Sequence, residues 1–221
     1  MNDPRSRPSG FLLDLDGVLV HSHRVHVEAY ERAFRHHGLE LDAEARRMVV
    51  GGAGRTHVLD HADVPETLTG PVSRAKEEAF LALLEAGALE AARGVEEVLD
   101  ALDAAGCPAA VVSNSATARE CVSAMGWAPR FQAVVGATDV ERVKPDPEPY
   151  RRAAALLGVP PEACVAVEDS ATGILSAREA GAFVAGVGAG AAPDSVDAWA
   201  PELAALPVGR WLGLPAPEAA R

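Results

Sequence analysis

Short apolar segments alternate with helical segments along this chain, and this alternation constrains the fold more than any other feature of the sequence. The apolar segments have the length and composition of buried strands. They are residues 11–15, 109–113, 163–167 and 183–187, with a weaker segment at residues 132–135. Strands that alternate with helices form a parallel sheet with helices on its faces. We therefore predict an α/β protein with a Rossmann-like parallel sheet at its core.

Each helical segment between these strands is followed by a glycine, which supports the assignment of the helices. A glycine after the last helical residue readily adopts the left-handed conformation that ends many helices. The helical segments are residues 95–105, 117–125, 147–157 and 172–180, and the glycines are Gly106, Gly126, Gly158 and Gly181. The core is therefore expected to repeat a strand, a helix and a tight turn.

The first predicted strand departs from this rhythm, because a long helical region follows it. Helical patterns cover residues 25–37, 43–50, 55–61 and 72–89, and the gaps between them contain no strand pattern. A crossover between two parallel strands needs only one helix. We therefore predict a core domain made of residues 1–19 and 92–221, interrupted by an all-helical cap domain at residues 20–91.

The composition argues against several classes of function. Asp and Glu outnumber Lys and Arg by 32 to 20, and the formal charge of -12 would repel the phosphates of a nucleic acid. No segment has the uninterrupted apolar length of a membrane span, and the first residues lack the apolar core of a secretory signal. The cysteines, Cys107, Cys121 and Cys164, are widely spaced and odd in number, as expected for free thiols. We therefore expect a cytoplasmic protein that binds neither nucleic acid nor membranes.

The first strand ends in two carboxylates, Asp14 and Asp16, which are followed by Gly17. Side chains two residues apart on a strand point to the same side, so these carboxylates are expected to lie together. Adjacent carboxylates repel each other unless a cation or a proton intervenes, and carboxylate and carbonyl oxygens are the ligands that Mg2+ prefers. Asp and Gly are also common in simple turns, so this segment alone leaves both interpretations open.

Further polar clusters fall at the ends of later strands and before a helix. In chain order they are Ser113-Asn114, Lys144-Pro145-Asp146 and Glu168-Asp169-Ser170. Together with the Asp-x-Asp-Gly segment, they resemble the four motifs of the haloacid dehalogenase (HAD) superfamily, in the branch of β-phosphoglucomutase and phosphoglycolate phosphatase-like enzymes with a helical cap. The resemblance covers roughly residues 10 to 190. It implies the HAD fold, hydrolysis of phosphoric monoesters and Mg2+ as cofactor.

The resemblance also implies a role for each carboxylate of these motifs. Asp14 is implied to attack phosphorus and form an aspartyl-phosphate, while Asp16 protonates the leaving group and later activates water. Asp16 is further implied to bind Mg2+ through its backbone carbonyl. Asp14, Asp169 and Glu168 are the other implied ligands of the metal.

The remaining core motifs are implied to contact the phosphorylated substrate. Lys144 would supply a fixed positive charge close to the oxygens of the transferring phosphoryl group. The Ser113 hydroxyl can donate a hydrogen bond to the same oxygens, and Asn114 is expected to contribute to substrate binding. For Lys144 the alternative is an ordinary surface lysine.

The predicted cap carries weaker candidates for substrate binding. Arg55 follows a glycine-rich segment at residues 51–54 that looks like the specificity loop of the family, and Lys76 and His26 match cap residues of the relatives. An arginine there can bind a distal anionic group, but an exposed turn and a solvated helix face fit the same residues. His21 departs from the family pattern, because relatives commonly carry an acidic residue at that position.

Hydrolysis of a small phosphorylated metabolite, with sugar phosphates first by resemblance, is the function we predict. Mutase relatives tend to carry a lysine in the turn after Ser113, where this chain has Ser115-Ala116-Thr117. A mutase must hold a bisphosphorylated intermediate and needs two strong anion sites, whereas a phosphatase needs one. A sugar phosphomutase like β-phosphoglucomutase is the alternative. A non-catalytic binding protein, in which every motif is idle, is a further one.

Overall fold

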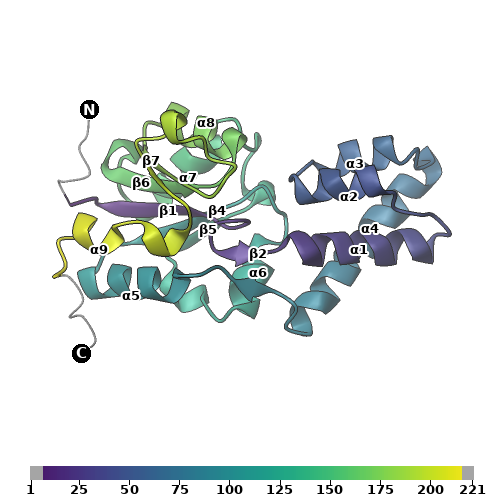
Figure 1. The fold of residues 1–221 in the computed structure, drawn as a ribbon, viewed down its shortest axis with the longest axis horizontal. Coiled ribbons are helices and arrows are strands. Elements are labelled where there is room, and N and C mark those ends of the chain that lie inside the picture. The colour runs from purple at the N-terminus through teal and green to yellow at the C-terminus, as the bar shows by residue number, and fades with distance from the viewer. Residues whose placement is uncertain (1–6, 216–221) are drawn as a thin grey trace. The chain divides into compact units, whose positions relative to one another are not determined.

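The computed structural model describes residues 7–215 of the chain. These residues belong to two compact units that the chain links twice (Figure 1). The first unit contains the chain up to Val20 and from Ala91 onward, and the second unit is His21–Glu90. Where the chain passes between the units, the short strands β2, Val20–His21, and β3, Glu90–Ala91, pair with each other. The first unit contains the predicted core sheet, and the second contains the inserted helices.

Within the described residues, the first unit is built on a six-stranded sheet in the order β5-β4-β1-β6-β7-β8. All of its strand pairs are parallel, which confirms the predicted α/β class. The strands are β1 Gly10–Asp14, β4 Ala109–Val112, β5 Ala133–Val135, β6 Cys164–Glu168, β7 Phe183–Val187 and β8 Ala198–Ala200. The strand order reverses at β1, and ligand sites in such sheets lie at the carboxyl ends of the strands near this reversal.

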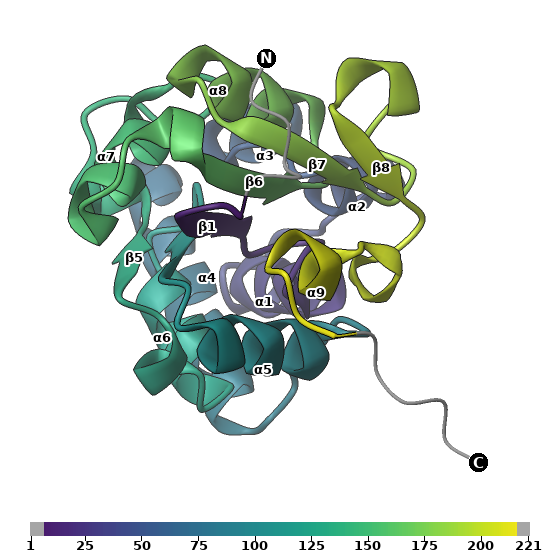
Figure 2. The same ribbon diagram turned by 90° about the vertical axis from the view of Figure 1, so that its left-hand side faces the viewer.

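Helices cover both faces of the sheet (Figure 2). α7 and α8 pack on one face, and α5 and α9 lie on the opposite side. The helices of this unit are α5 Val95–Ala105, α6 Ala118–Ala124, α7 Glu148–Leu157, α8 Ala171–Ala180 and α9 Val208–Trp211. Leu12, Val112, Tyr150 and Val184 belong to a buried cluster of strand and helix side chains. Removal of this apolar surface from water is the main stabilising term of such a layered fold.

The predicted strands and helices of the first unit agree with the structure to within one residue at each end. Gly106, Gly158 and Gly181 adopt the left-handed conformation at the C-caps of α5, α7 and α8. The sequence pattern did not indicate β8, whose central residue Trp199 is 42% exposed. An edge strand of this length is too short to display a period of two residues.

The second unit is a helical bundle with its own apolar core. Its helices are α1 His23–His36, α2 Ala43–Val50, α3 Arg55–His61 and α4 Glu66–Glu85. α1 packs along α4, and α2 packs against α1 and α3 (Figure 1). Tyr30, Phe34, Val58 and Val72 are among the residues buried between these helices.

The predicted start of the last cap helix at residue 72 is wrong, because α4 begins at Glu66 and continues through Pro71. Proline lacks a backbone N–H and normally interrupts a helix, which is why the sequence pattern favoured a later start. Val72 and Phe80 are buried in this unit, so packing of the apolar face holds the helix together across the proline. No helix within residues 7–215 is both long and apolar enough to cross a membrane.

Candidate active site

β1 brings Asp14 to the carboxyl edge of the sheet between two other strands. Asp14 is in register with Val112 of β4, and Leu13 is in register with Val167 of β6, so Glu168 follows at the level of Asp14. The side chain of Asp14 is almost fully buried at this edge. Parallel strands that end at one level place side chains from separate parts of the chain close together. Residues that are distant in the sequence therefore meet here.

A tight turn after β1 allows Asp169 to approach the backbone of the first motif. Gly17 has a φ of +90°, and a Cβ at this position would lie 1.9 Å from Asp169 Oδ2. Only glycine permits both this conformation and this approach. Carboxylate oxygens of Asp14, Glu168 and Asp169 lie within 4.8 Å of one another. A cluster of oxygen atoms at this spacing is suited to a divalent cation.

Lys144 supplies the positive charge at this edge of the sheet. Its ammonium donates to Asp14 Oδ1 at 2.5 Å, to Glu168 Oε1 at 2.6 Å and to the Val112 carbonyl at 2.8 Å. Because an ammonium has three N–H donors, these acceptors use all of them. Burial alone lowers the pKa of Lys144, but the Asp14 and Glu168 carboxylates outweigh burial and raise this pKa above its usual value. Lys144 is therefore a fixed cation that holds Asp14 in one orientation.

Glu168 is fully buried and accepts hydrogen bonds on both carboxylate oxygens. Oε1 accepts from Lys144 and, at 2.5 Å, from the hydroxyl of Tyr150 in α7. Oε2 accepts from the Asp169 N–H and from the Ser170 hydroxyl, both at 3.2 Å. The sequence did not single out Tyr150, because a tyrosine on the apolar face of a helix is typical of a core residue. The signal that could have identified it is that Tyr150 is a polar side chain near several alanines on the helix that follows the Lys144 motif.

Several carboxylates surround this one ammonium, so the cluster is short of positive charge. Burial first, and then the charge of Glu168, raise the pKa of Asp14 well above its usual value. The same two causes raise the pKa of Asp169 to about 7. A hard divalent cation with oxygen ligands would remove this repulsion. The donor set therefore fits Mg2+, with Asp14, Asp169 and the backbone carbonyl of Asp16 as candidate ligands.

Ser113 and Asn114 follow β4, and their side chains bind different partners. Ser113 Oγ donates to Asp16 Oδ2 at 3.4 Å and accepts from the Ser115 N–H at 3.0 Å. Asn114 Oδ1 accepts from the Lys144 N–H at 2.9 Å, and its Nδ2 donates to the Lys144 carbonyl at 3.1 Å. The Asn114 amide thus fixes the backbone that carries Lys144, and a contact of Asn114 with substrate stays a prediction.

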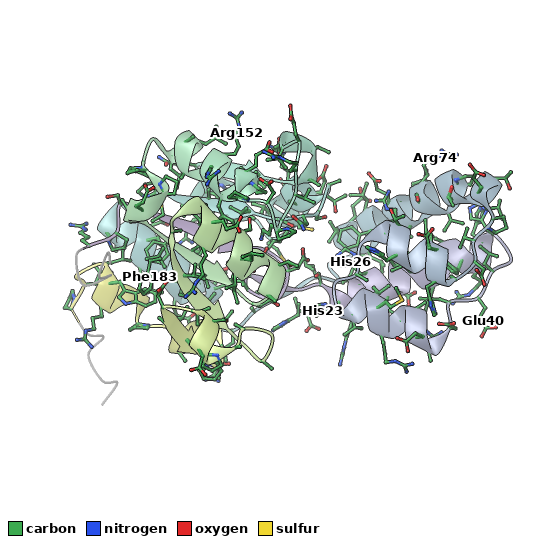
Figure 3. The ribbon with its side chains drawn as sticks, turned by 90° about the horizontal axis from the view of Figure 1, so that it is seen from above. His23, His26, Glu40, Arg74, Arg152 and Phe183 are labelled. Atoms are coloured by element: carbon green, nitrogen blue, oxygen red, sulfur yellow. The ribbon has the colours of Figure 1, made fainter. Side chains whose placement is uncertain are left out.

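In the second unit, the cap candidates Lys76 and His26 contact each other. Lys76 Nζ lies 3.1 Å from His26 Nδ1, and the His26 ring stacks on Phe80 with centroids 4.5 Å apart. The same ammonium lies 4.7 Å from the centroid of Phe80 and 5.4 Å from that of Tyr30. His26 belongs to the first turn of α1, where Figure 3 labels it near His23. Lys76, His26 and the rings of Phe80 and Tyr30 therefore form a compact cluster within this unit.

Arg55 begins α3 and makes a loose ion pair with Glu77 of α4. The charged atoms are 3.7 Å apart, and the two side chains are 42% and 44% exposed. His21, the residue that departs from the family pattern, lines a separate hollow of about 850 Å3 within the second unit. His23, Arg24 and Val50 are among the other residues that line it. This hollow contains none of the residues of the acidic cluster.

Comparison with known proteins identifies the family. The family model for haloacid dehalogenase-like hydrolases matches residues 8–181. The chain is 32% identical over 178 residues to validoxylamine A 7'-phosphate phosphatase of Streptomyces hygroscopicus subsp. limoneus, covering 80% of this chain and 84% of that protein. It is 33% identical over 187 residues to hexitol phosphatase A of Escherichia coli (strain K12), covering 83% of this chain and 84% of that protein.

The fold is shared with a solved structure. CbbY from Rhodobacter sphaeroides, crystallised in complex with phosphate, matches with a TM-score of 0.79 and 25% identity over 90% of this chain and 96% of that chain. Because this coverage exceeds the length of either unit, the similarity includes both the sheet and the inserted helices. The chain belongs to the haloacid dehalogenase-like hydrolase family.

Proposed function

We propose that this chain is a Mg2+-dependent phosphatase that hydrolyses a small phosphorylated metabolite through an aspartyl-phosphate on Asp14. The observation that carries the proposal is the bond of 2.5 Å between Asp14 Oδ1 and the buried ammonium of Lys144. A carboxylate held in one orientation at a ligand-binding edge is suited to act as a nucleophile. One relative is named for a 7'-phosphate and another for hexitols, which supports a sugar phosphate as the substrate.

The first half of the proposed reaction transfers the phosphoryl group to the protein. An oxygen of the Asp14 carboxylate attacks phosphorus, and the bond between phosphorus and the ester oxygen breaks. Asp16 gives its proton to that oxygen, which leaves as an alcohol. Asp16 follows Asp14 by two residues, close enough in the chain to serve the same reacting group, which supports its assignment as the acid.

The second half returns the protein to its starting state. Asp16, now a carboxylate, takes a proton from a water molecule as the water oxygen attacks phosphorus. The bond between phosphorus and the Asp14 oxygen breaks, and inorganic phosphate leaves. Asp16 ends protonated, as it began, so protons and electrons balance over the cycle.

We assign the stabilisation of negative charge during these steps to core residues next to Asp14. Asp14, Asp169 and the backbone carbonyl of Asp16 would hold Mg2+, which when bound offsets the repulsion between the carboxylate and the phosphate. Glu168 is a further candidate ligand, although its oxygens already accept hydrogen bonds from the protein. Lys144 orients Asp14 and adds a positive charge that is in place before the reaction begins.

We further propose that the second unit contributes to substrate binding through His26, Lys76 and Arg55. Lys76 is only 9% exposed, which is unusual for a lysine. A preorganised ammonium with an adjacent imidazole can bind the hydroxyl or phosphate groups of a sugar phosphate. Arg55 carries an exposed guanidinium that is suited to a distal anionic group.

Phosphate release from a panel of phosphorylated metabolites tests the proposal. The wild-type chain, Asp14→Asn and the control Asp100→Asn are compared with Mg2+ and with a chelator. Asp100 is 75% exposed on α5 and pairs with Arg130, so its amide variant should keep wild-type activity. Release that requires both Mg2+ and Asp14 is the expected result. Release that survives Asp14→Asn contradicts the nucleophile, and no release from any compound contradicts hydrolysis and leads to an assay for a mutase.

A further inference from the structure

Tyr150 is connected to the nucleophile through two buried groups. Its hydroxyl donates to Glu168 Oε1 at 2.5 Å, and the same oxygen accepts from Lys144 Nζ at 2.6 Å. Lys144 Nζ in turn donates to Asp14 Oδ1 at 2.5 Å. Tyr150, Glu168 and Lys144 all expose less than a tenth of their surface, so water contributes little to these bonds.

Tyr150 also contacts Lys144 directly through its ring. The ammonium lies 5.1 Å from the centroid of the Tyr150 ring, within the range of a cation–π interaction. The ring therefore limits where the ammonium can lie, and the hydroxyl limits where its Glu168 partner can lie. These two contributions are separable, because phenylalanine keeps the ring and removes only the hydroxyl.

The opposite side of the Glu168 carboxylate is closed by α8. A Cβ on Gly173 would lie 1.9 Å from Glu168 Oε1 and 2.1 Å from Oε2, so backbone occupies the space beside the carboxylate. The Ser170 hydroxyl, which donates to Oε2, also caps α8 by accepting from the Gly173 N–H at 3.1 Å. Glu168 is thus held between the N-terminus of α8 and the Tyr150 hydroxyl of α7.

We propose that Tyr150 is a positioning residue for the phosphatase reaction: its hydroxyl fixes Glu168, and Glu168 fixes the Lys144 ammonium against Asp14. This inference rests on the proposed function of the site. Tyr150 is 0% exposed, so its surface is closed to a ligand, and it contacts the site through Glu168 and Lys144. Small displacements of a catalytic group reduce turnover much more than they reduce binding.

Tyr150→Phe tests the inference by kinetics. We expect kcat to fall about three- to tenfold with KM unchanged, because the group that orients the nucleophile is loosened and the substrate contacts are not. Trp127→Phe is the matched control, since Trp127 is a buried aromatic residue that donates to the Glu96 carboxylate at 2.7 Å. That variant should keep the wild-type kcat. An unchanged kcat in Tyr150→Phe, or a change in KM alone, overturns the inference.

A double-mutant cycle tests whether Tyr150 acts through Glu168. In a Glu168→Ala background, adding Tyr150→Phe should lower kcat by less than about twofold, because the acceptor of the Tyr150 hydroxyl is already lost. An equal loss of kcat in both backgrounds would mean that Tyr150 acts by another route, and it overturns the inference.

A spectroscopic readout separates this inference from the proposed function. The chain contains two lysines, Lys76 and Lys144, so labelling lysine Nζ with 15N gives one ammonium signal from each unit. With chelator and no substrate, Tyr150→Phe should shift the Lys144 signal and leave the Lys76 signal in place. An unmoved Lys144 signal overturns the inference even if phosphate release depends on Asp14. If the wild-type chain releases no phosphate, or if Asp14→Asn releases as much as the wild type, the proposed function is refuted, whatever the 15N signals of the lysines show.

Discussion

The two lysines of this chain belong to different units and are held by different kinds of partner. Both are buried, with Lys144 6% exposed and Lys76 9% exposed. Lys144 donates to the carboxylates of Asp14 and Glu168 and to a backbone carbonyl. Lys76 contacts an imidazole nitrogen of His26 and the faces of two aromatic rings.

This difference separates a lysine that orients a reacting group from one that is suited to bind a ligand. The Asp14 and Glu168 carboxylates balance the charge of the Lys144 ammonium and fix its position beside Asp14. The Lys76 ammonium contacts the His26 imidazole and the faces of two aromatic rings. We therefore expect changes at Lys144 to affect turnover and stability, and changes at Lys76 to affect mainly the affinity for substrate.

Replacing each lysine with methionine gives the largest expected contrast. Lys144→Met should lower kcat by about 100- to 1,000-fold, because a preorganised charge is lost from the reacting centre. It should also lower the free energy of unfolding by about 3–5 kcal/mol, because buried carboxylates lose their cation. Lys76→Met should raise KM and lower the free energy of unfolding by only about 1 kcal/mol. Steady-state kinetics and denaturant unfolding of both variants check this, and equal effects on kcat would contradict the comparison.

Two helical glycines sharpen the same comparison between the units. Gly173→Ala in α8 should destabilise the chain by about 3 kcal/mol, because the new methyl group overlaps the Glu168 carboxylate in a closed space. Gly70→Ala in α4 should stabilise it by about 0.5–1 kcal/mol, since the nearest atom there is Arg74 Nη1 at 3.6 Å. Thermal unfolding measures both changes. If Gly173→Ala left the stability unchanged, Glu168 would be less tightly enclosed than the structure indicates.

The acidic cluster should also make stability depend on pH when Mg2+ is removed. Burial and the charge of Glu168 raise the pKa of Asp169 to about 7, so the folded state binds this proton more tightly than the unfolded state. The stabilising contribution is present below about pH 4 and is lost as the pH rises towards about 7. The melting temperature in chelator should therefore fall over this range, and Asp169→Asn should make the fall shallower.

Asp139 provides the control for this titration. The hydrogen bonds from Arg119 lower the pKa of Asp139, so it titrates below the range in question. Asp139→Asn should leave the slope of melting temperature against pH unchanged between about pH 4 and about pH 7. An equal effect of the two variants would show that the slope comes from global charge and not from the cluster.

The sequence predicted the arrangement of the core more fully than the roles of individual contacts. Asp14, Glu168 and Asp169 could be placed at one edge because alternating strands and helices imply a parallel sheet, whose strand ends meet. Lys144 followed from the motif and its resemblance. These inferences depend on the period of the apolar residues and on the order of strands and helices, and both can be derived from a single sequence.

Contacts that depend on side-chain direction could not be predicted in this way. Nothing in the pattern shows that Tyr150 aims its hydroxyl at Glu168, because the same residue on the same helix face also suits an apolar core. Asn114 was expected to contribute to substrate binding, and no feature of the sequence indicated that its amide also binds the backbone of Lys144 at both ends. The start of α4 at Glu66 was missed because the local effect of Pro71 is outweighed by packing of the helix face.

The smallest expected effect concerns Arg55, where binding and stability should separate. Its ion pair with Glu77 is long and exposed, so Arg55→Gln should change the free energy of unfolding by less than about 0.5 kcal/mol. If Arg55 binds the distal part of the substrate, KM should still rise about tenfold, because a charge-assisted hydrogen bond to that part is lost. Arg74→Gln, another exposed arginine of the same unit, controls for net charge and should leave KM unchanged. Equal KM values for the two variants would restrict substrate recognition in this unit to the buried pair of Lys76 and His26.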